Sequence, residues 1–391
     1  MRILIVVGGA VMGRPFMKFA AQQGHQVMVL THKTMLDGAW PHEALEEVIG
    51  VEHWQEKEIR NTVAWISQRR KIDRIVAVSD WDVETACMLR EHLRIPGMGE
   101  TTMRYFRDKL AMRIKAQEGG VRVPEFVHIL NHDDVFDFMQ RIPAPWVIKP
   151  RQAAASVGVK KMMTDQEVWQ RVMELGDEQS GYLIERYVPG QVYHVDSIVY
   201  DRKVLFRGVS KYGKSMLDLN VSGGVYSSRL IDRKDPDWQK LADLNDHVVE
   251  ALGLVRGPTH GEYIKGDDGK FYFLEIGARV GSAKIADVLC FATDVCLWHE
   301  WVKIETQDSY SLPPFREGYA GAVMCLAGPE TPDMTPYNDP EIAWVQNKPH
   351  HAGLIFQSPA AERVVALEKE YTERFMSDFM AHVPTPDHQT A

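Results

Sequence analysis

The sequence contains little cysteine. Its 391 residues include four, Cys87, Cys290, Cys296 and Cys325, and no two of them form a CxxC pair. This excludes a small disulfide-stapled scaffold and a zinc site built on closely spaced cysteine ligands. We therefore expect reduced thiols in a cytoplasmic protein.

Long apolar runs are also missing. No stretch reaches the roughly 18 consecutive apolar residues that a membrane span requires. The first residues, MRILIVVGG, form a short apolar run with no small-residue cleavage site after it, which is typical of a strand and not of a signal peptide. We expect no membrane partner.

An excess of positive charge is the third absence. Lys and Arg number 45 against 54 Asp and Glu, a net charge of −9, whereas a general nucleic-acid binder shows a basic patch or stripe. Small anions remain possible ligands, because a few local Arg and Lys residues can hold a phosphate in an acidic protein. The length and the 45% hydrophobic content allow two or three domains with their own cores.

The first hundred residues alternate strand-like and helix-like patterns. Apolar runs at 2–7, 26–30 and 74–78 are separated by helical patterns at about 14–23 and up to Leu93. This order predicts a doubly wound parallel sheet. The loop Gly8, Gly9, Gly13 departs from G-x-G-x-x-G, and no acidic residue ends the second strand, so a nicotinamide site is a weak alternative.

Three polar residues, Ser79, Asp80 and Asp82, follow the third apolar run. The carboxyl ends of parallel strands commonly line a substrate crevice. Capping of the next helix is the alternative role for these side chains.

A hairpin is predicted from Thr259 to Ser282. Two alternating runs flank Gly266-Asp267-Asp268-Gly269, which is strong turn chemistry. If Gly266 pairs with Gly269, Glu262 lies opposite Phe273 and His260 opposite Glu275. Glu262 and Glu275 are then diagonal neighbours on one face. Two such carboxylates suit a divalent cation whose coordination is completed by substrate phosphates, and a solvated hairpin is the alternative.

The middle of the chain carries charged residues at the ends of short apolar elements. Lys109 lies in a helix that ends at Gly119-Gly120, Lys149 ends the strand PWVIKP, and Glu185 lies in the strand YLIERYV. Between the two strands stands RQAAASVGV, a loop of small residues that lets backbone N–H groups approach an anion. Each feature alone has an ordinary structural explanation.

Taken together and in order, five stretches of the chain resemble the ATP-grasp superfamily. They are DK…GGVRVPEF, PWVIKP, SVGV, LIERYVPG and HGEYIK…FLEIGAR. Its amino-acid ligases and dipeptide-forming ligases are the most similar members, and biotin carboxylase is more distant. The resemblance runs from about Ile95 to Leu297. It implies a nucleotide held between two α+β lobes under a flexible lid, after a preATP-grasp domain.

The resemblance also implies roles for particular residues, with ATP and Mg²⁺ (or Mn²⁺) as cofactors. The implied nucleotide ligands are Lys109, Lys149, Ser156, Gly158, Glu185 and Val188. The implied metal ligands are Glu262 and Glu275, and the implied catalytic residue beside the transferred phosphate is Arg279. Two departures stand out: Gly277 replaces the usual Asn ligand, which puts a second Mg²⁺ in question, and alanines replace glycines in the lid.

The segment 208–230 links the two lobes and carries Lys211, Lys214 and Arg229 around a Ser-Gly-Gly turn. We interpret it as a loop over the acceptor site, with Lys211 as a second catalytic candidate. A solvated connector is the equally simple alternative.

The implied activity joins a carboxylate, as an acyl phosphate, to an amine, with release of ADP and phosphate. The partners are then small molecules, and a homodimer is left open. An ATP-dependent carboxylase acting on bicarbonate and a nucleotide-binding module without turnover are the alternatives.

The resemblance implies domains at 1–98, 99–190 with the lid, and 191–383, followed by a disordered tail at 384–391. Near the end we expect strands at 317–326 and 353–358 and a helix at about 360–380. The buried face of this helix is predicted to carry Val364, Val365, Leu367, Tyr371, Phe375 and Phe379. His350-His351 is a poor metal pair, because adjacent residues on an extended segment point to opposite faces.

Overall fold

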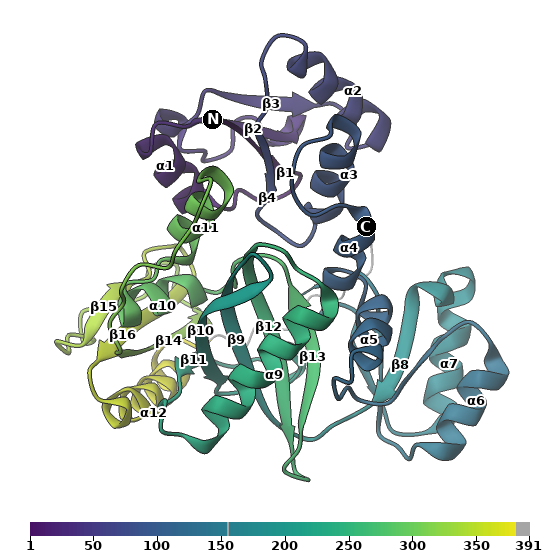
Figure 1. Cartoon of the computed structure of the whole chain (residues 1–391). Helices are drawn as coiled ribbons and strands as arrows, with labels where there is room; N and C mark the ends of the chain where they lie inside the picture. The colour runs from purple at the N-terminus through teal and green to yellow at the C-terminus, as the bar shows by residue number, and fades with distance from the viewer. Residues whose placement is uncertain (155, 381–391) are drawn as a thin grey trace.

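The computed structural model describes residues 1–154 and 156–380. These residues form three sheets (Figure 1), and the tail predicted at 384–391 lies outside them. None of the helices in this part of the chain combines the length and apolar character that crossing a bilayer demands.

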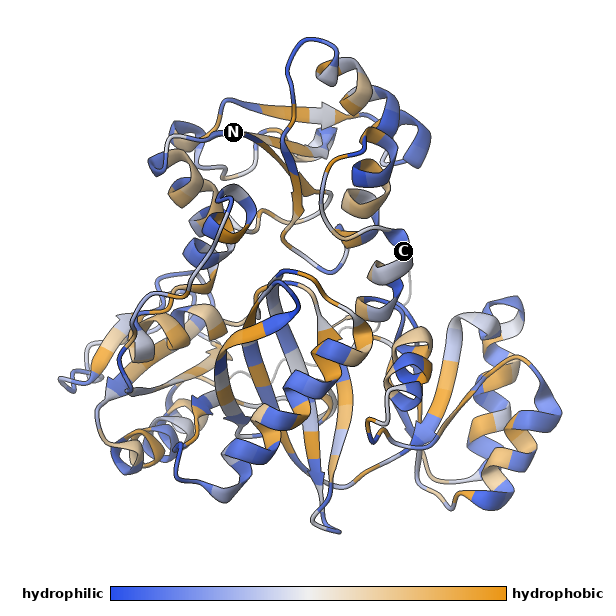
Figure 2. Cartoon of the chain, in the orientation of Figure 1, coloured by the Kyte–Doolittle hydropathy of each residue, from blue (hydrophilic) through white to orange (hydrophobic). Residues whose placement is uncertain are grey.

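The N-terminal sheet is parallel throughout, in the order β3-β2-β1-β4, which confirms the doubly wound prediction. Its strands are β1 (Arg2–Val7), β2 (Gln26–His32), β3 (Glu47–Val51) and β4 (Arg74–Ala77). Helix α1 (Arg14–Gln22) covers one face, and α2 (Glu56–Ser67) and α3 (Val83–Leu93) cover the other. Because both faces are covered, the central strands β1, β2 and β4 are apolar over most of their length, as Figure 2 shows.

The glycine loop of this sheet is explained by packing. A Cβ on Gly8 would lie 2.6 Å from the Trp54 ring, and one on Gly13 would lie 2.8 Å from Val78. Gly13 also has φ +72°, a conformation that favours glycine. Close packing and backbone geometry therefore account for both glycines without a bound dinucleotide.

A small antiparallel sheet follows, in the order β5-β8-β6-β7. It contains β5 (Phe126–His128), β6 (Trp146–Pro150), β7 (Lys160–Met162) and β8 (Tyr182–Arg186). Helices α6 (His132–Arg141) and α7 (Asp165–Leu175) pack on one face through a shared apolar cluster. The other face remains available to line a site.

The large sheet is antiparallel, with eight strands in the order β13-β12-β9-β10-β11-β14-β16-β15. They are β9 (Gly190–Tyr200), β10 (Lys203–Tyr212), β11 (Tyr226–Leu230), β12 (Gly257–Gly266), β13 (Phe271–Gly277), β14 (Tyr319–Leu326), β15 (Ile342–Val345) and β16 (His351–Ser358). Its helices are α5 (Lys109–Glu118), α8 (Met216–Ser222), α9 (Pro236–Leu252), α10 (Ile285–Thr293), α11 (Leu297–Thr306) and α12 (Ala361–Asp378), and short α4 (Glu100–Met103) leads into α5. Helices α5 and α9 share one apolar cluster with β9, β10, β12 and β13.

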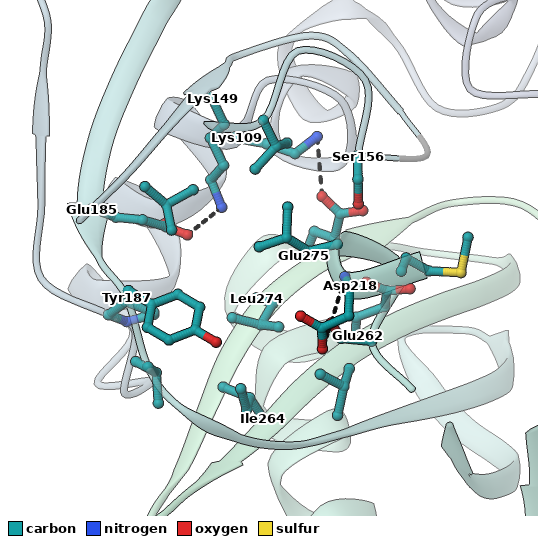
Figure 3. Close-up of a pocket in the computed structure, with 18 of the residues that line it drawn as sticks. Lys109, Lys149, Ser156, Glu185, Tyr187, Asp218, Glu262, Ile264, Leu274 and Glu275 are labelled. Atoms are coloured by element: carbon teal, nitrogen blue, oxygen red, sulfur yellow. Dashed lines mark hydrogen bonds and ion pairs between the residues drawn. The ribbon is translucent and has the colours of Figure 1, made fainter. Parts of the chain in front are cut away.

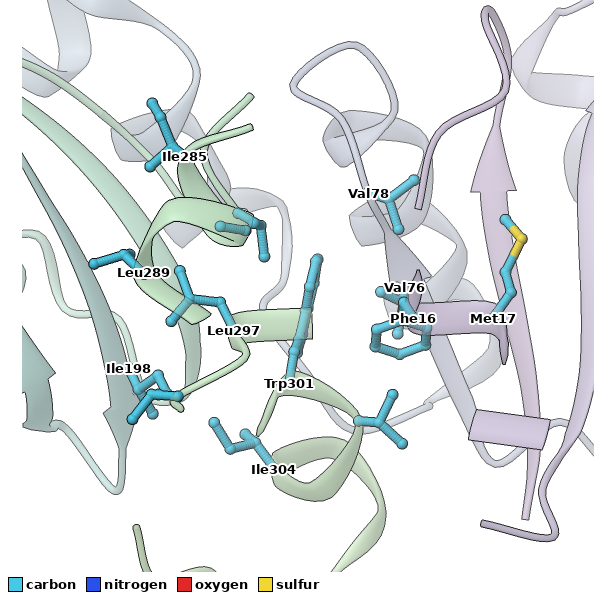
Figure 4. Packing of buried hydrophobic residues seen from close by; sticks show 14 of the residues in the cluster. Phe16, Met17, Val76, Val78, Ile198, Ile285, Leu289, Leu297, Trp301 and Ile304 are labelled. Carbon is cyan, nitrogen blue, oxygen red and sulfur yellow. The ribbon is translucent and has the colours of Figure 1, made fainter. Parts of the chain in front are cut away.

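One apolar cluster joins the N-terminal sheet to the large sheet. Phe16 of α1 meets Trp301 of α11 edge to face, with ring centroids 5.4 Å apart. Val76 and Val78 lie on the same side as Phe16, and Leu297 lies with Trp301 (Figure 4). This continuous core packs the ends of β1 and β4 against α11 and against the segment that follows the hairpin β12–β13.

The predicted terminal helix is confirmed with one exception. Val364, Leu367, Tyr371 and Phe375 are fully buried against β14 and β16, but Val365 is 43% exposed, so its predicted burial is wrong. The position after a buried residue turns away from the face that packs, because a helix advances about 100° per residue.

The expectation of four reduced thiols is also wrong. Cys290 of α10 and Cys296 just before α11 form a disulfide across a sequence separation of 6, while Cys87 and Cys325 are free and buried. The sharp turn between the two helices brings the cysteines together, and the spacing alone does not reveal that turn.

Candidate active site

The hairpin brings the two predicted metal acids closer than expected. Glu262 pairs directly with Glu275, and Tyr263 pairs with Phe273, so the predicted register is wrong. Gly266 N–H donates to Lys270 O at 2.9 Å, and Gly269 adopts φ +75°. Gly266 therefore pairs with Lys270 and not with Gly269, and the turn is one residue longer than the predicted two-residue turn. A bulge at Leu274 shifts the register again and turns Leu274 and Glu275 toward the same cavity.

Both acids have a partner on the cavity side. The Tyr212 hydroxyl donates to Glu262 Oε1 at 2.9 Å, and Lys109 Nζ lies 3.0 Å from Glu275 Oε2. Burial raises the pKa of Glu275, but the charges of Lys109 and Lys149 outweigh burial and lower that pKa to about 2. Glu275 is therefore a carboxylate at neutral pH, as a metal ligand must be.

A buried ion network stands on the other wall. Lys149 Nζ lies 2.5 Å from Glu185 Oε1, and Arg113 donates to Glu185 Oε2 at 3.1 and 3.2 Å. Burial lowers the pKa of Lys149 to about 8 in spite of Glu185. Burial acts to raise the pKa of Glu185, but Lys149 and Arg113 lower it overall. Arg113 was not predicted, because one basic residue in a helix gives no sign of burial.

These groups surround one cavity between the small sheet and the hairpin (Figure 3). It is lined by both lysines, Glu185, Glu262 and Glu275 at its polar end. The rest is mainly apolar, from Val147, Val159, Val188, Val192, Met216, Leu217, Ile264 and Leu274. A flat aromatic group fits the apolar part of such a cavity, while anionic groups fit the end that carries the lysines.

The predicted lid lies at the mouth of this cavity, with Ala155 outside the described residues. Ser156 lines the cavity, whereas Gly158 does not. Gly158 has φ +73°, and a Cβ there would lie 3.3 Å from Pro150, so backbone conformation explains the glycine.

Lys211 does not line the cavity, so the structure does not bring it together with the other predicted site residues. It pairs with Tyr193 and Arg229, and its Nζ lies 6.0 Å from the Tyr193 ring centroid, on the face of the large sheet that packs against α9. Successive strand residues face opposite sides, so the next residue, Tyr212, is the one that reaches Glu262. The following segment forms α8, whose Met216, Leu217 and Asp218 cover the cavity.

Arg279 lies in a second, adjoining cavity. Its Nε and Nη2 donate to Asp80 Oδ2 at 2.9 and 2.6 Å, an ion pair between β13 and the end of β4. Lys109 and Glu275 line both cavities. A Cβ on Gly277 would lie 2.9 Å from Asp80 Oδ1, so Asp80 occupies the space into which a side chain at position 277 would extend.

Asp82 has neither of the two predicted roles. Its carboxylate makes no capping hydrogen bond to α3, and it does not line either cavity. Instead it accepts from Gly8 N–H at 2.7 Å and from Ser79 Oγ at 2.5 Å. It therefore fixes the glycine loop to the end of β4.

A buried polar cluster lies behind Glu262. Asp196 Oδ2 is 2.6 Å from His194 Nδ1, and Asp196 Oδ1 is 2.9 Å from His260 Nδ1. Burial lowers the pKa of His260, but Asp196 outweighs it and raises that pKa to about 9. Within the described residues, this is the one group of His, Cys, Asp and Glu side chains with ligand atoms close enough for a metal ion, and His350-His351 is not part of it. The side chains of this cluster satisfy one another's hydrogen bonds. An ionised carboxylate can only accept, so Asp196 accepts from both histidines.

Comparisons with known proteins show which families and folds the chain is similar to. Residues 142–287 match the family model described as ATP-grasp domain. An L-arginine-specific L-amino acid ligase of Bacillus subtilis is 23% identical over 238 residues, which cover 59% of this chain and 57% of the relative. A D-alanine–D-alanine ligase of Neisseria meningitidis is 26% identical over 198 residues, 49% of this chain and 64% of the relative. The chain thus spans about three fifths of the length of these curated relatives.

Solved structures extend the likeness to nearly the whole chain. The L-amino acid ligase from Bacillus licheniformis superposes with a TM-score of 0.76 at 18% identity, covering 95% of this chain and 97% of that one. N5-carboxyaminoimidazole synthetase from Staphylococcus aureus, solved with ADP, gives 0.72 at 16% identity and 96% coverage of each chain. At these identities the superpositions show the fold. The chain contains an ATP-grasp domain, set in the fold that these enzymes share.

Proposed function

We propose that the protein is an ATP-dependent carboxylate–amine ligase that forms an acyl phosphate. The observation that carries this proposal is the single cavity that holds Lys109, Lys149, Glu185, Glu262 and Glu275 between two sheets. These are the residue types, in the positions, that the ATP-grasp resemblance assigns to a nucleotide and its metal.

The residues fit ATP and a divalent cation. The apolar walls suit an adenine ring, and the ammonium of Lys149, at the polar end, suits its phosphates. Glu262 and Glu275, directly opposite each other on one face, offer the hard oxygen donors that Mg²⁺ prefers. A bound Mg²⁺ supplies charge neutralisation at the phosphates.

The second cavity suits the acid to be activated. Arg279 presents a planar fork that matches a carboxylate, and its present partner is Asp80. A substrate carboxylate that replaces Asp80 on Arg279 lies beside Glu275 and Lys109, which line both cavities.

The chemistry then needs positioning and no protein nucleophile. A carboxylate oxygen attacks the γ-phosphorus, the bond to ADP breaks, and an acyl phosphate forms. An amine attacks the acyl carbon, phosphate leaves, and the amine loses a proton. Arg279 holds the carboxylate and stabilises the charge on its oxygens, which is the main contribution that a protein makes to phosphoryl transfer. Cover over the cavity from Ser156 and α8 excludes water from the acyl phosphate.

An amino acid is the substrate class that we favour, since the two curated relatives described above are named as an L-amino acid ligase and a D-alanine–D-alanine ligase. Bicarbonate is the alternative acceptor, because carboxylases share the fold.

The test is a screen of ADP release over amino acids singly and in pairs, with bicarbonate as a separate arm and mass spectrometry of the products. We expect an amide product that depends on ATP, Mg²⁺ and an amine. ADP release with bicarbonate alone would favour the carboxylase. Tight ATP binding without turnover on any acid would indicate that the protein is a nucleotide-binding module and not an enzyme.

A further inference from the structure

Arg107 is a buried cation that has no acidic partner among the residues that the structure describes. It lies between the short helix α4 and α5 (Figure 1) and is 8% exposed. Its Nε is fully buried and has no hydrogen-bond partner in the part of the chain that the structure describes. The two other arginines buried to this degree both donate hydrogen bonds: Arg90 to Ile75 O and Arg113 to Glu185.

An unpaired buried guanidinium is unfavourable. Arginine stays protonated in proteins, so the cost of burial cannot be avoided by loss of the proton. Buried charges are therefore normally paired. An anion that binds beside Arg107 would relieve this cost, and the relief would appear as binding energy for that anion.

The surroundings of Arg107 indicate where such an anion binds. Arg107 lines the second cavity together with Asp80, Lys109, Glu275 and Arg279. Its guanidinium carbon lies 5.0 Å from the centroid of the Trp81 ring, and a guanidinium that stacks on an aromatic face keeps its planar N–H donors for an anion.

The other charges of this cavity are balanced. Arg279 pairs with Asp80 at 2.6 Å, and Lys109 pairs with Glu275 at 3.0 Å. His260, which also lines the cavity, pairs with Asp196 at 2.9 Å. Arg107 is therefore the cation left over among the described residues that line the cavity. If Arg279 takes the carboxylate that is activated, Arg107 is free to take a second anionic group.

We propose that Arg107 binds a second carboxylate of the acid substrate and makes the enzyme selective for dicarboxylic acids, acidic amino acids included. This proposal rests on the proposed ligase function. A carboxylate fits better than a phosphate group, because Asp80 and Glu275 on the same wall repel a doubly charged group more strongly.

The test compares acids with their neutral amides: L-glutamate with L-glutamine, and L-aspartate with L-asparagine. Hydroxylamine serves as the amine, so that every activated acid is trapped as a hydroxamate with release of phosphate. We expect kcat/KM to favour the acid of each pair by about 10- to 100-fold, the usual scale for a charged hydrogen-bond partner in a buried site.

Three variants assign this preference to Arg107. Arg107→Gln should abolish the preference for the acid, mainly by lowering kcat/KM for the acid. Arg107→Lys should keep part of the preference, because it retains the charge but not the fork. Arg104→Gln changes an exposed arginine three residues earlier and should leave the preference intact. The acid-to-amide ratio is measured within one preparation, so it does not depend on the folded fraction.

A binding measurement separates this proposal from the ligase proposal. L-Glutamate and L-glutamine are titrated calorimetrically into protein saturated with Mg²⁺ and a non-hydrolysable ATP analogue. If glutamate binds more tightly to wild type than to Arg107→Gln, the role of Arg107 is supported, even if no acid turns over. Absence of turnover would refute the ligase function but not the role of Arg107. Equal affinity for the two ligands, or the same acid-to-amide ratio in wild type and Arg107→Gln, overturns the role of Arg107.

Discussion

Replacement of Lys149 by methionine should separate nucleotide binding from folding. The pKa of Lys149 is lowered from 10.5 to about 8 by burial. At 1.36 kcal/mol for each pKa unit, the charged Lys149 ammonium destabilises the ligand-free folded state by about 3 kcal/mol relative to the unfolded chain. Methionine has a similar stem without the charge, and Glu185 keeps its hydrogen bonds from Arg113. Removal of Lys149 also takes one of two cationic partners from buried Glu185, so the two effects offset each other and we expect the free energy of unfolding of Lys149→Met to change by less than about 2 kcal/mol.

The same substitution should weaken ATP binding by about 10- to 100-fold, since it removes a charge-assisted contact to phosphate. Urea denaturation at pH 7 measures the stability, and calorimetry with Mg²⁺ and ATP measures the affinity. Lys160→Met, an exposed lysine on β7, is the matched control and should change neither quantity. A loss of more than about 2 kcal/mol of stability with unchanged ATP affinity would show that Lys149 is structural, because that is the scale of losing a buried polar contact.

The lowered pKa of Lys149 also predicts proton uptake. Phosphates raise the pKa of a neighbouring ammonium. Above pH 8 the Lys149 amine of the free protein is mostly deprotonated, so ATP binding should be accompanied by uptake of a proton. At pH 6 Lys149 is already protonated, and we expect no uptake. Calorimetry in two buffers of different ionisation enthalpy measures the uptake, which should vanish in Lys149→Met. Uptake that persists in the variant would assign the proton to another group.

Three further outcomes are expected. Glu275→Gln should abolish ADP release while the circular dichroism spectrum stays unchanged, and near-normal turnover would contradict its role as a metal ligand. Asp196→Asn should lower the free energy of unfolding by about 3–5 kcal/mol, because it breaks a buried charged pair with His260, whereas exposed Asp243→Asn should stay within about 0.5 kcal/mol in the same denaturation experiment. Gly277→Asn should lower the melting temperature, because a Cβ there meets Asp80 Oδ1 at 2.9 Å, and an unchanged melting temperature would show that Asp80 moves freely.

Much of the fold follows from sequence patterns. The apolar runs at 2–7, 26–30 and 74–78 predicted the parallel sheet, because strands buried on both faces are apolar throughout. Strand β3 and helix α2 were missed: β3 lies at the sheet edge and is only partly buried, so its apolar signal is weak.

The acids of the site were predictable, but their register was not. Turn residues at 266–269 indicated a hairpin, yet the longer turn and the bulge at Leu274 depend on backbone geometry that the residue letters do not encode. On β10, successive residues face opposite sides of the sheet, and for this reason Tyr212, not Lys211, reaches the cavity.

Partners that are distant in sequence could not be predicted. Arg113 meets Glu185 across 72 residues, and Arg279 meets Asp80 across 199 residues. Nothing near Arg107 in the sequence shows that it is buried without an acid. Such pairings arise only when separate elements pack, which a single sequence does not reveal.

We propose that Glu262 and Glu275 hold the metal of a nucleotide in the cavity between the small sheet and the hairpin. Calorimetric titration of ATP, with and without Mg²⁺, into wild type and the Glu262→Gln, Glu275→Gln double variant tests it most directly. We expect Mg²⁺ to strengthen ATP binding by wild type and to have no effect on the double variant. An equal effect of Mg²⁺ on both proteins would contradict the claim.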